Sequence, residues 1–154
     1  MDHQDKEQRE WPAMVDLGGN ESVRRVVLHS PAALHALAEK MENWMRVLAY
    51  GGTDLFAVRL ALGEAIINAF RHGNQGDPEK VVRVNYLVTH GEVIVEVEDD
   101  GPGFDPSQVA DQRAGGTSER VRGRGLFLMR VYMSGVTFNR QGNRVTFWRR
   151  RSPA

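Results

Sequence analysis

The sequence predicts an α+β fold: a two-layer sandwich in which a mixed, mostly antiparallel sheet carries its helices on one face. Three observations support this prediction. Apolar, β-branched runs of strand length occur in pairs around short polar turns, as in antiparallel hairpins. In other stretches, apolar residues recur at the three- and four-residue steps of a helix. The predicted order is strand, two helices, two strands, a loop, a helix and two strands.

Composition limits the possible classes of protein. The chain has 154 residues, of which 41% are hydrophobic, and a formal net charge of zero. We therefore expect one domain over residues 21–151 after a flexible tail at residues 1–20. A neutral balance gives no general attraction to nucleic acid or to a membrane, and no apolar run approaches the length of a membrane span. The absence of cysteine and of an N-terminal apolar segment favours a cytoplasmic protein.

The first half of the predicted domain holds one strand and two helices. The β-branched run at residues 22–29 is typical of a strand. Ser30 and Pro31 then suit the N-cap and the first position of a helix, whose apolar residues follow at helical spacing. The sequence "YGGT" ends that helix, and Thr53 is expected to cap a second helix over about residues 54–71.

The second half holds four strands and one helix. A hairpin is predicted to turn at His90 and Gly91, and a final hairpin around the sequence "QGN". The remaining predicted elements are strands at residues 81–89 and 92–99, a mobile loop at 107–125, a helix at 126–133 and strands at 135–140 and 144–150. The loop is predicted from its low apolar content.

A polar ridge runs along the second predicted helix. Apolar residues occupy nearly the whole circumference of residues 60–70, so this helix should be largely buried. Glu64, Asn68 and His72 follow at four-residue steps and therefore share one face. Because a buried carboxylate needs a partner, two interpretations are open. The ridge either satisfies nearby backbone groups or faces a ligand, with Glu64 as a base and Asn68 as an oxygen ligand of Mg²⁺.

An acidic residue ends a strand that should pack on the helices. The valines within residues 93–97 alternate toward one face, and the same period places Asp99 on that face. Gly101 and Gly103 follow, where glycine permits unusual backbone angles and close approaches. An ordinary Asp-Gly turn would explain the glycines but not the inward acid. A carboxylate in this setting can accept a hydrogen bond from an exocyclic amine such as that of adenine.

A pair of glycines directly precedes the third predicted helix. Gly123 and Gly125 would leave free backbone N–H groups at a helix N-terminus, where the positive end of the helix dipole suits a phosphate. Arginines cluster nearby, at Arg113, Arg120, Arg122 and Arg124. The alternative is a flexible linker with solvated arginines. The sequence does not form a Walker-type loop, because no Gly-Lys-Ser/Thr is present.

Together and in this order, the three sites resemble the N, G1 and G2 boxes of the GHKL ATPase superfamily. Within it, residues 22–150 are similar to the bacterial anti-sigma-factor serine kinases, most closely in "LALGEAIINAFRHGN", "VEDDGPGFDP" and "GRGLFLMRVYMSGVTF". The resemblance implies that Glu64 is the general base for a serine hydroxyl, that Asn68 binds Mg²⁺ and that Asp99 holds the adenine amine. It also implies a mobile lid at about residues 110–122.

The resemblance further implies ATP and Mg²⁺ as cofactors and two protein partners. The substrate would be the serine of a small anti-anti-sigma protein, and the other partner would be a sigma factor, sequestered when that antagonist is unavailable. We expect a homodimer, with the first strand and helix as the candidate surface. The nucleotide-contacting residues implied are Asn68, His72, Asn74, Asp99, Gly101, Gly103, Gly123, Arg124, Gly125 and Leu126.

Three alternatives are weighed against this hypothesis. The catalytic domain of a sensor histidine kinase usually has a phenylalanine-bearing box and a phosphoacceptor histidine on a helical hairpin, and neither is evident; His35 suits a solvated surface position. A regulatory module could bind ATP or ADP without transferring phosphate, which Glu64 disfavours. A nucleic-acid binder could use the terminal "WRRRSPA", although a solvated basic tail is the simpler interpretation at zero net charge.

Overall fold

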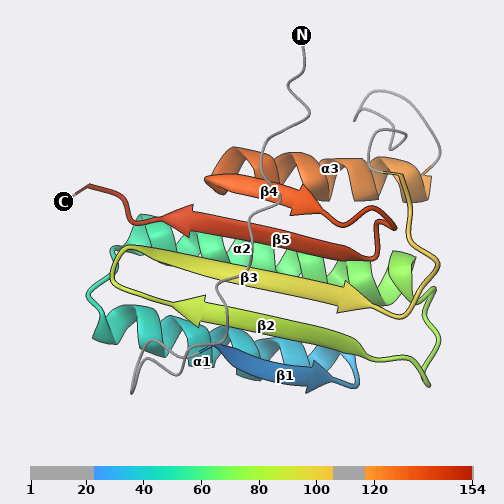
Figure 1. Cartoon of the computed structure of the whole chain (residues 1–154), viewed down its shortest axis with the longest axis horizontal. Helices are drawn as coiled ribbons and strands as arrows, with labels where there is room; N and C mark the ends of the chain where they lie inside the picture. Colours follow the sequence, from blue (N-terminus) through green and yellow to red (C-terminus); the bar gives the residue numbers. More distant parts are fainter. Residues whose placement is uncertain (1–22, 106–116, 154) are drawn as a thin grey trace, which may run out of the picture.

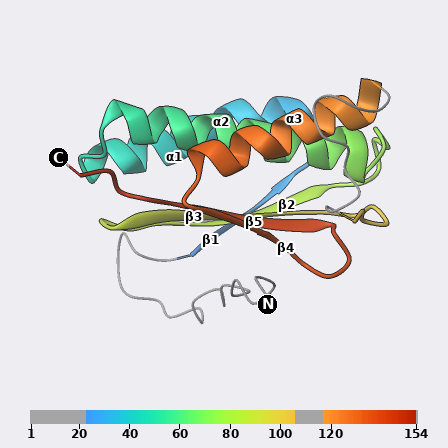
Figure 2. The ribbon, with the colours of Figure 1, turned by 90° about the horizontal axis from the view of Figure 1, so that it is seen from above.

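The computed structural model describes residues 23–105 and 117–153, without the side chains of residues 117–122. A five-stranded antiparallel sheet forms one layer, and three α-helices cover one of its faces (Figures 1 and 2). The predicted two-layer α+β class is therefore confirmed. The expected flexible tail at residues 1–20 and most of the expected lid lie outside the described residues.

The elements follow the predicted order. Their bounds are β1 (Arg24–Leu28), η1 (Pro31–Ala33), α1 (Leu34–Val47), α2 (Gly52–Asn68), η2 (Ala69–Gly73), β2 (Val82–Val88), β3 (Glu92–Asp99), α3 (Thr117–Tyr132), β4 (Gly135–Phe138) and β5 (Arg144–Arg150). Of the two short elements, η1 is a 3₁₀ helix and η2 is a π-helical turn that continues α2. Among the described residues, no helix is long and apolar enough to span a membrane.

The sheet order is β1-β2-β3-β5-β4, and every neighbouring pair is antiparallel. In the register of the sheet, Val95 of β3 lies beside Phe147 of β5, and both are buried under the helices. The predicted inward row of β3 valines is thus confirmed. Ile94 points to the opposite face, yet it is only 1% exposed beside its cross-strand partner Trp148.

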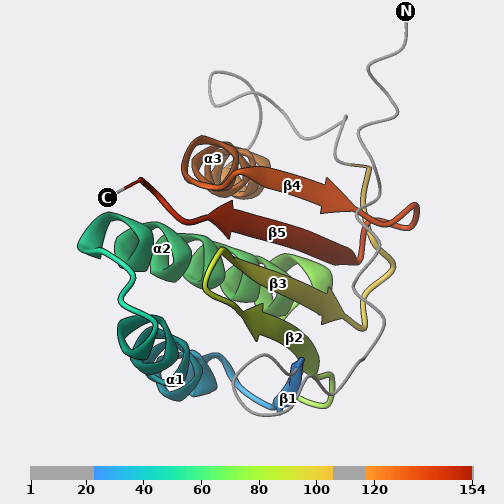
Figure 3. The same ribbon diagram turned by 60° about the vertical axis from the view of Figure 1, so that its left-hand side comes forward.

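Helix α2 is the central helix of the covering layer and is buried as predicted. It lies between α1 and α3 and crosses the sheet behind β3 and β5 (Figure 3). Ala57, Ala61 and Ala65 are fully or almost fully buried, and their small side chains let the helix approach its neighbours closely. Close packing around α2 fixes the direction in which its polar side chains point.

Two predictions about helix ends are wrong. Thr53 does not cap α2: the N-cap is Gly51, without a side-chain cap, and Thr53 lies inside the first turn. Helix α3 begins at Thr117 rather than at residue 126, so Gly123 and Gly125 lie inside the helix and not before it. Tertiary packing against α2 outweighs the weak helix propensity of the glycines at these two positions.

A buried ion pair ties the C-terminal segment to the start of α2. Asp54 is only 2% exposed, and its carboxylate accepts hydrogen bonds from Arg149 Nε at 2.7 Å and from the Ser152 hydroxyl at 2.7 Å. Arg149 also donates to the carbonyl of Tyr132, the last residue of α3. Burial acts to raise the pKa of Asp54, but the bonds from Ser152 and Arg149 outweigh it and hold that pKa below its usual value.

A second arginine of the same segment binds the end of α1. Arg151 donates to the carbonyls of Leu48, at 2.8 Å, and Ala49, and its guanidinium lies 4.7 Å from the centroid of the Tyr50 ring. We call Asp54, Arg149, Arg151 and Ser152 the C-terminal clamp. Because Arg149 and Arg151 hold helix ends, the expectation of a solvated basic tail is wrong for these two residues, whereas Arg150 is exposed. The same contacts disfavour a nucleic-acid-binding tail.

Candidate functional site

Three segments that are distant in sequence meet at the end of the molecule opposite the C-terminal clamp. They are the last turns of α2 with η2, the loop after β3, and the first described turns of α3 (Figure 1). The three motifs identified in the sequence lie on these segments. The fold therefore brings together residues that the sequence predicts to form one site.

Glu64 and Asn68 lie one turn apart on the face of α2 that packs against α3. A Cβ atom added to Gly125 would lie 2.6 Å from Glu64 Oε2 and 3.1 Å from Asn68 Nδ2. The backbone of α3 therefore rests on both polar groups, and a larger side chain at position 125 would displace them. Both side chains are half-buried. The predicted polar ridge thus faces α3, with the two groups directed to the same place.

Asp99 ends β3 on the side of the helices, as predicted, and two glycines enclose its carboxylate. The Gly101 N–H donates to Asp99 Oδ1 at 2.8 Å. A Cβ on Gly73 would overlap the Asp99 carboxylate, and a Cβ on Gly101 would overlap the Gly73 carbonyl. Glycine is required at both positions because the backbone of η2 touches the acidic side chain directly.

Asn74 is fully buried directly after η2. Its Nδ2 donates to the Val81 carbonyl at 3.0 Å, and its Oδ1 accepts a hydrogen bond from the Asp100 N–H at 2.8 Å. The side chain therefore connects the end of the helix with the start of β2 and the end of β3. This geometry gives Asn74 a structural role beside the site. His72 lies half-buried within η2.

Asp100 points to the outer side of the sheet. It accepts a hydrogen bond from Arg83 Nη1 at 2.6 Å and one from the Val81 N–H at 3.2 Å. The Arg83 bond is the main reason that the pKa of Asp100 lies below its usual value. Asp100 is therefore partly exposed but paired, and it anchors the loop from the outside.

The β4–β5 turn locks the glycine loop that follows Asp99. Gly103, with φ +84°, packs so closely that a Cβ would overlap the Gln141 carbonyl, and Gly142, with φ +80°, packs in the same way against the Phe104 carbonyl. The turn itself is rigid, because Asn139 Oδ1 accepts three backbone hydrogen bonds. Their donors are the N–H groups of Gly142, Asn143 and Arg144.

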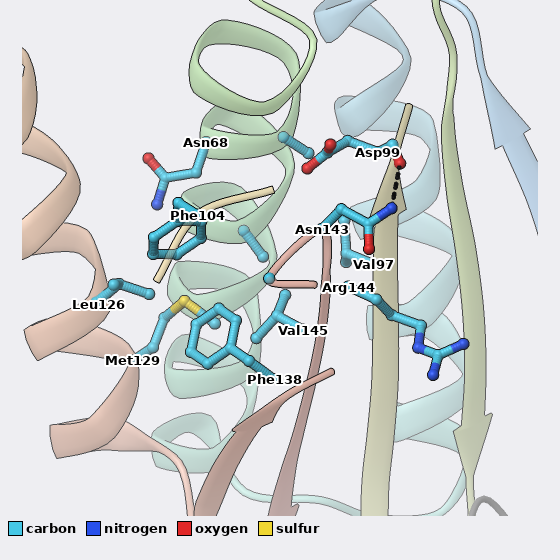
Figure 4. Close-up of a pocket in the computed structure, with 13 residues that line it drawn as sticks. Asn68, Val97, Asp99, Phe104, Leu126, Met129, Phe138, Asn143, Arg144 and Val145 are labelled. Atoms are coloured by element: carbon cyan, nitrogen blue, oxygen red, sulfur yellow. Dashed lines mark hydrogen bonds between the residues drawn. The ribbon is translucent and has the colours of Figure 1, made fainter. Parts of the chain in front are cut away.

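A small cavity lies between these segments, and Figure 4 shows its walls. The polar side chains of Asn68 and Asp99 lie at its edge. Its apolar lining includes Val97, Phe104, Leu126, Met129, Phe138 and Val145. The rings of Phe104 and Phe138 meet edge to face with centroids 5.5 Å apart. The cavity measures about 30 Å³, which is space for about one water molecule.

The chemistry of these groups suits a purine nucleotide. An apolar slot with a carboxylate at one end can hold an aromatic base and accept a hydrogen bond from its amine. Among the described residues, no group of three His, Asp or Glu side chains could hold a metal ion. An amide oxygen from Asn68 together with phosphate oxygens is nevertheless a donor set that Mg²⁺ accepts, because this ion takes few protein ligands.

The sequence located only part of this site. Of the predicted residues, Asn68, Asp99 and Leu126 line the cavity, whereas Arg124 is exposed on α3 and Gly123 is half-buried. The predicted phosphate-binding helix N-terminus is not present at these glycines, as described above. The cavity residues that the sequence analysis missed include Phe104, Met129, Phe138 and Asn143. Phe104 alone carried a signal, its position directly after the second glycine of the loop.

Comparison with known proteins gives a match over most of the described domain. Residues 27–148 match the family described as "Histidine kinase-like ATPase domain". "Serine-protein kinase RsbW" from Listeria monocytogenes is 31% identical over 85 residues, which cover 51% of this chain and 54% of that protein. "Anti-sigma F factor" from Geobacillus stearothermophilus is 27% identical over 95 residues, which cover 60% of this chain and 65% of that protein.

The chain thus spans about half to two thirds of the length of these relatives. A solved structure with a similar fold is "The crystal structure of the RsbU and RsbW domains of Rv1364c from Mycobacterium tuberculosis". The match has a TM-score of 0.57 and 17% identity, and it covers 86% of this chain and 33% of that chain. At this identity the likeness concerns the fold.

Proposed function

The chain belongs to the family of histidine kinase-like ATPase domains, and from this premise we propose that it is an ATP- and Mg²⁺-dependent serine protein kinase. Its substrate is a small anti-anti-sigma protein. When that antagonist is unavailable, the kinase binds and sequesters a sigma factor in the cytoplasm. The names of its relatives, a serine-protein kinase and an anti-sigma factor, support this proposal.

One observation carries the proposal. Glu64 and Asn68 direct their polar ends to the same place under Gly125, beside a cavity whose other polar wall is Asp99. This arrangement places a general base and an amide side chain on α2 and a separate amine acceptor at the end of β3. Phosphoryl transfer from a nucleotide needs this distribution, with the adenine ring held at one end of the site and the phosphates at the other.

Each polar residue then has a distinct role. Asp99 accepts a hydrogen bond from the adenine amine, and the apolar walls cover the faces of the ring. Asn68 would hold Mg²⁺ through its amide oxygen, and the ion would neutralise the phosphate charge. Glu64 accepts the proton of the substrate serine. Positioning and charge neutralisation supply most of the rate in such transfers, so few protein groups are needed.

Binding requires the cavity to open. Its present volume of about 30 Å³ holds a water molecule and not a purine. We expect the moving walls to be Phe104, which lies on a loop, and the turn of α3 that carries Leu126 next to Gly125. We expect α3 to separate from Glu64 and Asn68 when the nucleotide enters.

The homodimer belongs to the same proposal. Strand β1 lies at the edge of the sheet, and Val27 on it is 49% exposed. A hollow of about 510 Å³ lies between β1 and α1 and is lined by both, including Arg24 and Leu37. An exposed edge strand with an apolar residue is the kind of surface that a second copy can cover.

Substitution of Glu64, the proposed general base, tests the proposed activity. The Glu64→Gln variant should lose transfer of labelled phosphate from ATP to a purified anti-anti-sigma protein by about 10²-fold or more, as expected for a general base. Its affinity for ATP should change little, because the adenine contacts are intact. The matched control is Glu39→Gln on the exposed face of α1, which should transfer normally.

The same assay separates the proposal from its nearest rival. ATP binding by the wild type with no transfer to any anti-anti-sigma protein would contradict the kinase and favour a nucleotide-binding regulatory module. The packing of Gly125 over Glu64 is the observation that would suit such a module, because it covers the base. Undiminished transfer by Glu64→Gln would remove Glu64 from the mechanism.

A further inference from the structure

We propose that Asn74 positions the Asp99 carboxylate to bind the nucleotide base and thereby sets the preference for a purine that carries a 6-amino group. The inference rests on the proposed nucleotide site. Asn74 acts through the backbone and is a positioning residue, in contrast to the direct nucleotide contact that the sequence suggested for it.

The side-chain amide of Asn74 is buried and hydrogen-bonded at both ends. Its side chain is 0% exposed, and both ends of the amide are hydrogen-bonded to backbone groups, the Val81 carbonyl and the Asp100 N–H. A buried amide without such partners is strongly unfavourable. The side chain is therefore oriented by its bonds, with the oxygen toward β3 and the nitrogen toward β2.

The bond to Asp100 holds the peptide group that directly follows Asp99. The partner of Asn74 Oδ1 is the N–H of the peptide that joins Asp99 to Asp100, at 2.8 Å. On its other side Asn74 binds Val81, which precedes β2, and Val82 lies opposite Asp99 in the sheet. One side chain thus fixes the end of β3 relative to the start of β2, and it sets the backbone from which the carboxylate projects.

The helix end delivers two contacts to Asp99 at once. The π-helical turn is closed by a hydrogen bond from the Asn74 N–H to the Ala69 carbonyl at 2.8 Å. This turn places Gly73 against the Asp99 carboxylate and Asn74 against the following peptide. Such π turns are frequent at functional sites. A shift of the turn would therefore move the carboxylate and its backbone support together.

The β4–β5 turn holds the other side of the same residue. The Asp99 N–H donates to the Asn143 carbonyl at 2.9 Å, and Asn143 Nδ2 donates to the Asp99 carbonyl at 3.3 Å. Loss of Asn74 would leave these two bonds in place and release only the side toward the glycine loop. The expected result is a folded protein whose carboxylate is less well aimed, which separates positioning from general stability.

The test compares two nucleotides that differ at one group. Purine riboside 5′-triphosphate carries hydrogen where ATP carries the 6-amino group. The wild type should bind ATP about tenfold or more tightly than this analogue, because a hydrogen bond to a charged group is lost. In Asn74→Ala the ratio of the two dissociation constants should fall below about threefold. Asn85→Ala, which removes a half-buried amide bonded to Glu96 in the sheet, should keep the wild-type ratio.

The outcomes separate this inference from the proposed function. A wild type that binds neither nucleotide contradicts the proposed site itself. A wild-type ratio that persists in folded Asn74→Ala overturns only the role of Asn74, even if the variant is less stable. If Asn74 had a purely structural role, Asn74→Ala would lower the melting temperature and weaken the binding of both nucleotides equally.

A measurement on the wild type decides the matter should Asn74→Ala not fold. The side-chain amide of Asn74 gives its own pair of proton–nitrogen NMR signals. We expect these signals to shift on saturation with ATP and to shift clearly less with the analogue that lacks the amine. Equal shifts with both nucleotides would overturn the inference.

Discussion

The two ends of helix α2 hold their polar side chains in different ways. At its start, Asp54 is buried and fully paired with Arg149 and Ser152. At its end, Glu64 and Asn68 are half-buried and lie against Gly125 of α3. The first end satisfies every charge inside the protein, whereas the second leaves polar groups beside a cavity. Stability and binding are therefore assigned to different ends of one helix.

The same contrast holds for the segments around each end. The C-terminal clamp uses long arginine side chains that reach the ends of α1 and α3. The site uses the absence of side chains: Gly73, Gly101 and Gly125 bring backbones against carboxylates and amides. Substitutions at the two ends should therefore separate folding from nucleotide binding, and sites this far apart should act nearly independently.

The largest effect on stability is expected at the clamp. Asp54→Ala leaves Arg149 partly buried without its carboxylate, and loss of one partner of a buried pair costs about 3–5 kcal/mol. Urea denaturation should show this loss in the free energy of unfolding. Glu39→Ala, on the exposed face of α1, is the control and should differ little from the wild type. An affinity for ATP that fell in parallel with the stability of Asp54→Ala would break the separation between the two ends.

A smaller loss is expected at the glycine loop of the site. Gly103→Ala places a Cβ against the Gln141 carbonyl at a positive φ, and forced overlap in a packed region costs about 1–3 kcal/mol. Here ATP affinity should also fall, because the loop carries Phe104, a wall of the cavity. The control is Gly91→Ala in the β2–β3 turn, where an added Cβ meets no atom. Unchanged ATP binding by Gly103→Ala would show that the loop does not shape the pocket.

The sequence predicted the fold and the central residues of the site because each has a local signal. Alternation placed Asp99 inward, and the four-residue step placed Glu64 and Asn68 on one face. Both results follow from the geometry of a single element. Contacts between elements carry no such signal, which is why the bonds of Asn74 to Val81 and Asp100 did not appear.

The errors have the same cause. Low apolar content and two glycines predicted a loop before residue 126, but packing of Gly125 on Glu64 favours a helix that begins at Thr117. The arginines of "WRRRSPA" have the composition of a solvated tail. Arg149 nevertheless binds a carbonyl at the end of α3, 17 positions away, and Arg151 binds a carbonyl directly after α1, 103 positions away. Only the folded chain brings those partners within reach.

Acid should weaken the clamp. The pKa of Asp54 is below its usual value of 3.8 in the folded state, so its contribution to stability is present above that pH and is lost as pH falls through the lower folded-state pKa. The free energy of unfolding should therefore fall steeply below about pH 4, and more steeply in the wild type than in Asp54→Ala. Parallel curves for the two proteins would show that Asp54 does not carry the acid sensitivity.

The smallest effect is expected on the exposed face of α2. Gly63 lies inside the helix with open space around it, so Gly63→Ala should raise the free energy of unfolding by about 0.5–1 kcal/mol through helix propensity alone. Thermal or urea denaturation measures this gain. ATP affinity should stay at the wild-type value although Glu64 is the next residue. A loss of stability would mean that position 63 packs against a neighbour.

The central claim is that the cavity between α2, the end of β3 and α3 opens to bind ATP, and calorimetric titration tests it most directly. The wild type should bind one ATP per chain in the presence of Mg²⁺. Asp99→Asn should bind it about tenfold or more weakly, since a charged hydrogen-bond acceptor is lost, while its stability stays close to that of the wild type. Absence of binding by folded wild-type protein to both ATP and ADP at millimolar concentration would contradict the account.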